Sequence, residues 1–302
     1  MLRSTLFRCR ERQHRETMSD PGSSEGVRSV QLAIDVLEAV AFCADELGVT
    51  QIAARLKMTK GSVHRHLQTL VERGYLIQNA ATSRYAIGPK SRLLARHAPE
   101  ADLVHLAEGS IRQLRDALGH TVVLSQMTPG GALVLTKLSG VSPIEIGVRP
   151  GSELTFHASA QGKVMLAFAP PALQARLLAR PLERFTDRTI VAPRRIERDL
   201  QEIARLGFAA APQETLLGLN AVAAPIFDAQ DACVAALAIV ASIQFLPPKP
   251  RPSDVAQLVE AARQVSRKLG NGSAAEHPGT ARRRPRAVRP RQSSLRGLRS
   301  AT

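Results

Sequence analysis

The segment "MTKGSVHRHLQTLVERGYLI", residues 58–77, combines polar side chains suited to an acidic partner with an apolar stripe. At about 100° per residue, four side chains fall within one sector and predict the buried face of a helix: Val63, Leu67, Leu70 and Val71. Arg65 lies almost opposite that sector. Ammonium, hydroxyl, imidazole and amide groups lie between the two: Lys60, Ser62, His64, Gln68 and Thr69. The exposed face near the start of this helix therefore offers hydrogen bonds to an anion.

These polar groups suit the chemistry of duplex DNA. An arginine guanidinium binds guanine or phosphate through paired hydrogen bonds, and hydroxyls and amides suit phosphates or base edges. Gly61 lowers helix stability by about 1 kcal/mol relative to Ala, and close approach of the backbone to a duplex would explain its presence. His64 and His66 lie on different faces, without a Cys or carboxylate at ligand spacing, so no metal site is predicted.

We predict that DNA is contacted by this helix, its cap and neighbouring elements, through Arg28, Thr50, Thr59, Lys60, Ser62, His64, Arg65, Gln68 and Arg84. Two of these residues keep an alternative interpretation. Arg84 fits a minor-groove or phosphate contact as well as it fits an ordinary charge on a hairpin, and the same holds for Arg28.

The elements around this helix predict a winged helix-turn-helix over residues 27–89. Ser29 and Thr50 are expected to cap two preceding helices, and Thr59 caps the helix that stops at Gly74. Two short strands then surround a polar turn, at 75–78 and 84–87. Helix, helix, helix and hairpin is the order of that motif.

Composition supports a polyanionic partner for this chain. The 302 residues carry a formal net charge of +15 and 44% hydrophobic residues, enough for a core. Aromatic residues make up 3%, too few for a surface that stacks single-stranded bases. Three scattered Cys residues and no membrane-length apolar run favour a reducing, cytoplasmic location.

The second half mixes helix and strand signals. Strands are expected on both sides of the turn at 128–131, and again at 220–227 and 233–242. An amphipathic helix is expected over 195–207 and a final helix over 253–270. The fold class is therefore α+β with a mainly antiparallel sheet. The predicted division is a disordered extension, a DNA-binding domain, a linker helix, an effector domain and a disordered Arg-rich tail, at 1–26, 27–89, 90–105, 106–270 and 271–302.

Several motifs, in order and spacing, resemble those of the IclR-type bacterial transcriptional regulators: "LAIDVLEAV", "TQIAARLKMTKGSVHRHLQTLVERGYL", "RYAIGPK", "HASAQGKVMLAF", "DLQEIARLGFA" and "GLNAVAAPIFD". The resemblance covers about residues 27–270. It implies a winged helix-turn-helix, a linker helix and an effector domain of GAF-like fold, without a cofactor. It also implies homodimers or tetramers that bind a double-stranded operator.

The resemblance places a small-molecule effector between the sheet and the loop of "HASAQGK". Carried over to this sequence, it implies contacts from His157, Ser159, Ala160, Gln161, Glu214, Ala221, Ala238 and Val240. Relatives that bind small keto acids often carry an acid, a Cys and two Ser where this chain has Ala211, Ala221, Ala238 and Val240. A more apolar pocket suits an aromatic or longer organic acid. Plain core packing explains Ala and Val equally, and a buried His157 fits a structural role.

Three functions are weighed. The leading one is a sequence-specific transcriptional regulator, repressor or activator, controlled by an organic acid through linked binding. An enzyme is disfavoured because the chain lacks a G-x-S-x-G elbow, a P-loop and a G-x-G-x-x-G motif, and no third group joins His157 and Ser159. The third is an architectural, nonspecific DNA-binding protein that depends on the Arg-rich tail.

Overall fold

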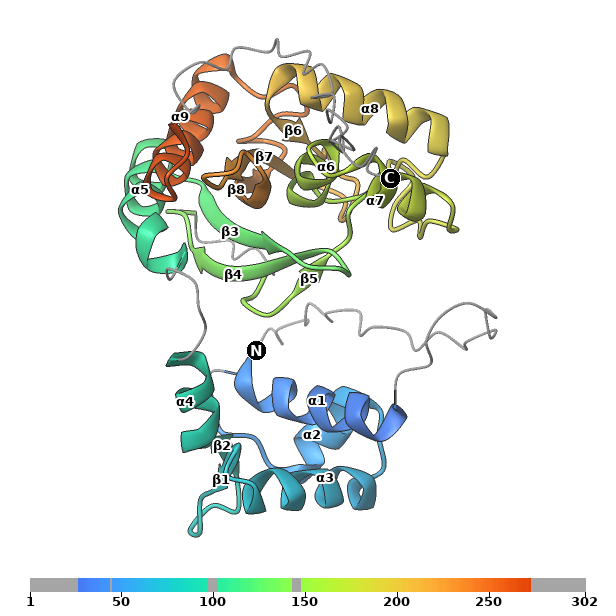
Figure 1. The fold of residues 1–302 in the computed structure, drawn as a ribbon, viewed down its shortest axis with the longest axis vertical. Coiled ribbons are helices and arrows are strands. Elements are labelled where there is room, and N and C mark those ends of the chain that lie inside the picture. The colour runs from blue at the N-terminus through green and yellow to red at the C-terminus, as the bar shows by residue number, and fades with distance from the viewer. Residues whose placement is uncertain (1–26, 44, 97–102, 143–147, 273–302) are drawn as a thin grey trace, which may run out of the picture.

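The computed structural model describes residues 27–43, 45–96, 103–142 and 148–272, in two units (Figure 1). The predicted disorder of 1–26 falls outside the described residues, as does that of all but the first two residues of 271–302. No helix in the described ranges is both long enough and apolar enough to cross a membrane.

The N-terminal unit is a winged helix-turn-helix, as predicted. It contains helices α1 (Arg28–Ala41), α2 (Val49–Leu56) and α3 (Lys60–Glu72), followed by antiparallel strands β1 (Leu76–Gln78) and β2 (Tyr85–Ile87). All five elements share one apolar core, which includes Val36, Val40, Ile52, Val63, Leu67, Leu70, Leu76 and Tyr85. The core fixes α3 against α1 and α2 and leaves the other side of α3 in solvent.

Two of the three predicted helix caps are wrong. Thr59 caps α3, since its Oγ1 accepts a hydrogen bond from the Ser62 N–H at 3.3 Å. Ser29 lies inside α1, whose N-cap is Val27. Thr50 lies inside α2, whose N-cap is Gly48, with its N–H donated to Gln51 Oε1 at 3.0 Å. Both helices begin earlier than the hydroxyl residues indicate, because a backbone or amide group satisfies the first turn instead.

The predicted linker region, 90–105, contains parts of two helices. Helix α4 (Pro89–Arg96) follows the hairpin, and α5 (Leu103–Leu118) begins after the undescribed residues 97–102. Helix α5 packs on the C-terminal sheet through Ala107, Ile111 and Leu114. Leu103 and Val104, which lie within the predicted linker, pack against the same core, so at least that part of the segment contributes to the C-terminal unit.

The C-terminal unit is built on one antiparallel sheet, in agreement with the predicted α+β class. Its strand order is β5-β4-β3-β8-β7-β6. The strands are β3 (Thr121–Met127), β4 (Ala132–Leu138), β5 (Glu153–Leu154), β6 (Ala209–Ala210), β7 (Leu219–Phe227) and β8 (Cys233–Ser242). Strands β3 and β8 lie at the centre, so the chain closes the sheet by pairing distant segments.

Helices cover both faces of this sheet (Figure 1). Alternate strand residues such as Val122, Val222 and Ile239 pack against α5 and α9 (Pro252–Lys268). Residues of the opposite parity, such as Ala223 and Ala238, pack against α6 (Ala160–Ala167) and α8 (Pro193–Leu206). The short helix α7 (Pro171–Leu178) extends the second layer. The predicted effector residues belong to the α6 side.

Candidate nucleic-acid interface and small-molecule site

Helix α3 presents its polar face to solvent. Val63, Leu67 and Leu70 are buried, whereas His64, Arg65 and Gln68 are exposed. In the first turn, Lys60 is exposed and Ser62 is half-buried. The hydrogen bonds and ion pairs of the described residues leave the Arg65 guanidinium without a partner. The structure therefore brings six of the predicted DNA-binding residues together on one exposed side: Thr59, Lys60, Ser62, His64, Arg65 and Gln68.

Gly61 has no role in the packing of the protein itself. A Cβ atom added there would meet nothing within 4 Å. Glycine in a helix lowers stability by roughly 0.5–1 kcal/mol relative to Ala. Since the fold gains nothing in return, an external surface that approaches the helix backbone is the simplest reason for glycine at this position.

The remaining predicted DNA-binding residues lie on other elements. Thr50 is exposed in the first turn of α2, and Arg28 is exposed at the first residue of α1. Arg84 lies in the turn of the wing, where its Nη1 donates a hydrogen bond to the Glu46 carbonyl at 3.2 Å. This bond favours a structural role for Arg84. The residue is nevertheless exposed, and its guanidinium has further N–H groups that do not bind the Glu46 carbonyl.

Glu46 holds the wing through contacts that no sequence pattern predicts. Its Oε2 accepts hydrogen bonds from Asn79 Nδ2 at 3.2 Å and from Thr82 Oγ1 at 3.3 Å. The Asn79 Oδ1 in turn accepts the backbone N–H of Ala81 at 3.0 Å, which closes the turn. The wing is thus tied to the segment between α1 and α2.

In the C-terminal unit, two of the predicted effector residues make internal hydrogen bonds. Ser159 caps α6, since its Oγ accepts the Gly162 N–H at 3.0 Å and donates to the Thr155 carbonyl at 2.7 Å. His157 Nε2 lies 2.8 Å from the Glu183 carbonyl, and its ring stacks on Phe185. Burial lowers the pKa of His157, and the Glu183 carbonyl opposes that change. A neutral ring that donates from Nε2 fits these contacts.

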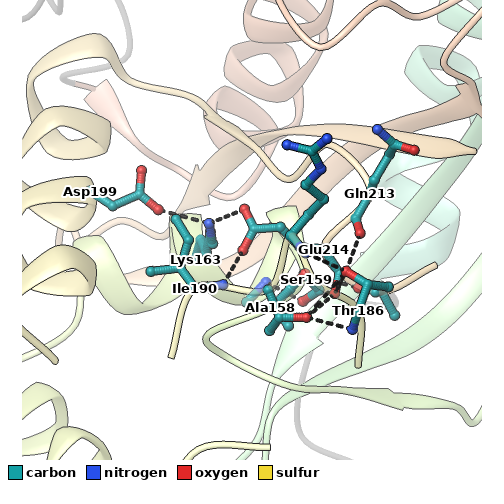
Figure 2. Close-up of polar contacts among 12 residues, drawn as sticks. Ala158, Ser159, Lys163, Thr186, Ile190, Asp199, Gln213 and Glu214 are labelled. Atoms are coloured by element: carbon teal, nitrogen blue, oxygen red, sulfur yellow. Dashed lines mark hydrogen bonds and ion pairs between the residues drawn. The ribbon is translucent and has the colours of Figure 1, made fainter. Parts of the chain in front are cut away.

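Lys163 is the centre of a buried ionic network (Figure 2). Its side chain is only 1% exposed, and Nζ donates to Asp199 Oδ2 at 2.8 Å and to Glu214 Oε1 at 2.5 Å. Glu214 Oε2 also accepts the Ile190 N–H at 3.3 Å. Burial raises the pKa of Glu214, while the Lys163 charge opposes the rise. The carboxylate of Glu214, predicted as an effector contact, is therefore occupied by α6 and its neighbours.

The backbone around Glu214 is held by two threonine hydroxyls. Thr189 Oγ1 donates to the Glu214 carbonyl at 2.6 Å, and Thr186 Oγ1 donates to the Gln213 carbonyl at 2.6 Å. These bonds join the loop after α7 to the loop between β6 and β7. Sequence reasoning missed Lys163, Asp199 and both threonines, because the pairs are separated by many residues along the chain.

Three predicted effector residues meet on one face of the sheet. Val240 pairs with Ala221, and Ala238 lies two residues before Val240 on the same strand. Ala221 and Val240 pack with Val123 and Val134, whereas Ala238 shares a cluster with Ala160 of α6. These three side chains are apolar and offer no hydrogen bond. The structure thus brings Ala160, Ala221, Ala238 and Val240 into one region.

Some polar groups in this region have no partner. Ser125 of β3 is 0% exposed, and its Oγ makes no hydrogen bond. It pairs with Ala236 and lies two residues beyond Val123, so it faces the α6 side. Gln161 is 2% exposed, and its side chain finds no partner among the described residues. Nor do the N–H groups of Ala160 and Gln161 at the start of α6. A ligand between α6 and the sheet would satisfy such groups.

Two surface cavities of the C-terminal unit lie elsewhere. One, of about 390 Å³, lies between α5 and α9, and the other, of about 170 Å³, lies between α5 and β4. None of the predicted effector residues lines either cavity. Neither cavity is therefore the site that the resemblance implies between α6 and the sheet.

Comparisons with known proteins agree with this architecture. The model of the IclR helix-turn-helix domain matches residues 29–80, and that of the bacterial transcriptional regulator IclR C-terminal region matches residues 95–267. The HTH-type transcriptional regulator BhcR of Paracoccus denitrificans is 32% identical over 251 residues, which cover 80% of this chain and 88% of that protein.

Solved structures share the fold. The Thermotoga maritima IclR has a TM-score of 0.61 and 25% identity, over 80% of this chain and 98% of that one. An IclR homologue from Microbacterium hydrocarbonoxydans, complexed with 4-hydroxybenzoate, has a TM-score of 0.67 and 24% identity, over 80% of this chain and 98% of that one. Both domains of the chain, and their order, occur in these relatives.

Proposed function

Because this chain belongs to the IclR family of bacterial transcriptional regulators, we propose that α3 reads an operator duplex and that an organic acid controls this binding. The observation that carries the proposal is the free, exposed Arg65 on a helix whose opposite side is buried. A helix of about this diameter fits the major groove, where side chains on its exposed face contact the base edges. The protein acts in the cytoplasm, where bacterial DNA lies.

Each exposed group on α3 has a distinct task. Arg65 and Gln68 reach base edges, since arginine and glutamine form paired hydrogen bonds with guanine and adenine. Lys60, Ser62 and His64 lie toward the helix start and bind phosphates, which set position rather than sequence. Thr50 and Arg28, on α2 and α1, add further backbone contacts. Gly61 lets the first turn approach the duplex closely.

The protein binds DNA as a dimer or a dimer of dimers. Helices α1 and α4 carry apolar residues that are exposed in the single chain: Val30, Ile34, Leu93 and Leu94. A second copy that covers these residues would place two α3 helices on neighbouring half-sites. Sedimentation of the parent and of a Leu93→Gln, Leu94→Gln variant tests this arrangement. A monomeric parent would contradict it.

The effector is an organic acid with an apolar body. Ala221, Ala238 and Val240 offer no hydrogen bond, so this surface favours a ring or an alkyl chain over a small keto acid. The free N–H groups at the start of α6 suit the carboxylate, because a helix N-terminus attracts anions. The homologue complexed with 4-hydroxybenzoate makes this acid the first probe. His157 and Ser159 shape the site from behind, and Ala160 and Gln161 contact the acid.

Two measurements test the function. Selection of duplexes from a random pool should enrich one pseudo-palindromic sequence, and titration with 4-hydroxybenzoate should change the affinity for it. A ligand that binds only the folded state also raises the melting temperature, by an amount that grows with the logarithm of its concentration relative to Kd. Enrichment of no sequence above random DNA would reject a sequence-specific regulator. A melting temperature unaffected by aromatic and longer aliphatic acids would reject the effector class.

A further inference from the structure

An aromatic ring of the N-terminal unit contacts the backbone of the C-terminal unit. Phe42, directly after α1, is 44% exposed and lies against Gly151, shortly before β5. A Cβ atom added to Gly151 would lie 2.4–2.6 Å from three carbons of the Phe42 ring. The ring therefore sits directly on the glycine backbone. Gly151 also has φ +81°, a conformation that glycine adopts far more readily than other residues.

On the N-terminal side, Phe42 is fixed to α1, which packs against α3. Its N–H donates to the Glu38 carbonyl at 3.0 Å, so the residue continues the last turn of α1. Helices α1 and α3 share one close-packed core that includes Val40 and Leu67. Such packing transmits a displacement rather than absorbing it. A shift of the Phe42 ring relative to Gly151 is therefore a shift of α3 relative to the C-terminal unit.

On the C-terminal side, Gly151 is fixed to the apolar face proposed for the effector. The Gly151 N–H donates to the Val134 carbonyl at 2.8 Å, and the Val134 N–H donates to the Ser152 carbonyl at 2.9 Å. The Val134 side chain is 1% exposed and packs in one cluster with Val240 and Ala221. One residue thus touches the proposed effector site with its side chain and holds Gly151 with its backbone.

We propose that the contact between the Phe42 ring and the Gly151 backbone is the one through which occupancy of the effector site changes the position of α3. This inference rests on the proposed function and names its route of regulation. An acid that inserts beside Val240 displaces Val134, which packs with it, and Gly151 follows because its N–H is hydrogen-bonded to the Val134 carbonyl. Phe42 is then a positioning residue that touches neither ligand. Coupling of this kind requires an element whose arrangement both ligands bias.

The first experiment measures the coupling itself. Operator affinity is determined with and without saturating 4-hydroxybenzoate for the parent, Phe42→Ala and a matched control, Phe245→Ala, which removes a phenylalanine that is 54% exposed. The parent and the control should change affinity by on the order of fivefold or more. In Phe42→Ala the ratio of operator affinities with and without the acid should approach one, while calorimetry shows unchanged binding of the acid. A parent-like ratio in Phe42→Ala overturns the inference and leaves the proposed function intact.

The second experiment observes the contact without DNA. The chain contains no Trp, so Phe42→Trp introduces a single tryptophan whose fluorescence reports on the contact with Gly151. Adding Gly151→Ala should push the ring away and shift its emission, whereas the same change should leave a Phe245→Trp emitter unaffected. Unchanged emission of the Phe42→Trp emitter overturns the inference.

A third measurement tests the inference even where the acid does not bind. If 4-hydroxybenzoate does not bind the parent, the proposed effector class fails, and the inference is decided by operator affinity in the absence of acid. Without acid, the operator affinity of Phe42→Ala should differ from that of Phe245→Ala by on the order of fivefold, since the contact between Phe42 and Gly151 biases the position of α3. Equal affinities overturn it.

Discussion

Helices α3 and α6 begin alike and serve opposite purposes. Each is capped by a hydroxyl, Thr59 for α3 and Ser159 for α6. Helix α3 buries one side and leaves its cation, Arg65, free in solvent. Helix α6 is buried from Ala160 to Leu166, and its cation, Lys163, is bound by two carboxylates. We propose that Arg65 finds its partner outside the protein, whereas the charge of Lys163 is paired inside and serves the fold.

The largest expected effect concerns the internal pairing of α6. Glu214→Gln removes one of the two carboxylates that balance the buried Lys163, so the free energy of unfolding at pH 7 should fall by about 3–5 kcal/mol. Glu202→Gln is the matched control, because Glu202 pairs with Arg205 on the surface at 4.0 Å and should lose less than about 1 kcal/mol. Denaturant titrations that give similar losses for both would remove the contrast between the helices.

The next effect concerns the outward face of α3. Arg65→Ala should weaken operator binding by about 1–3 kcal/mol and leave the melting temperature unchanged, because the side chain contacts only solvent in the free protein. Arg73→Ala, an exposed arginine that caps the far end of the same helix, is the control for net charge. Binding isotherms at matched salt decide between them. Equal affinities for the two variants would exclude Arg65 from the groove.

Two glycines sharpen the comparison further. A Cβ at Gly162 of α6 would lie 2.3 Å from the Thr155 carbonyl oxygen, so Gly162→Ala should destabilise the fold by about 1–3 kcal/mol. Gly61→Ala meets no atom and should stabilise the fold by roughly 0.5–1 kcal/mol. The same Gly61→Ala change should weaken operator binding, since the added methyl group stands between helix and duplex. A variant that gains stability and keeps full affinity would separate Gly61 from DNA binding.

The smallest effect is a pH dependence from His157. Its pKa is lowered in the folded protein, so the unfolded chain binds the proton more readily, and stability is lost as pH falls below about 6.5. His157→Gln keeps a donor for the Glu183 carbonyl and should make that loss shallower, by no more than about 1.4 kcal/mol per pH unit. Melting curves between pH 5 and pH 8 measure the difference. A steeper loss in the variant would contradict the assignment of a neutral ring.

Sequence reasoning succeeded where the pattern is local. The spacing of Val63, Leu67 and Leu70 predicted both the buried side of α3 and the exposure of Arg65, because amphipathic helices repeat every 3.6 residues. The hairpin after Gly74 and the antiparallel sheet also followed from short patterns. The caps failed at Ser29 and Thr50, since a backbone group can replace a hydroxyl there without any trace in the sequence.

The internal contacts of the C-terminal unit were beyond such patterns. Lys163 stands in a helix that is buried on all sides, so no periodicity marks its charge as special. Its partners lie 36 and 51 residues away, and only the fold brings them together. The contact between Phe42 and Gly151 joins two units, and no local pattern in either unit predicts it. The placement of Ala221, Ala238 and Val240 on one face came from family resemblance and not from their chemistry.

The central pairing of β3 with β8 has a consequence for synthesis on the ribosome. Strand β3 is synthesised before the middle of the chain is reached, but its neighbour β8 emerges near the end of the described residues. The N-terminal unit needs only nearby segments, so it can collapse while the sheet still waits for its second central strand. A nascent chain would thus contain a folded DNA-binding domain before its effector domain can fold. Translation that stops before β8 would release a DNA-binding fragment that an effector cannot regulate.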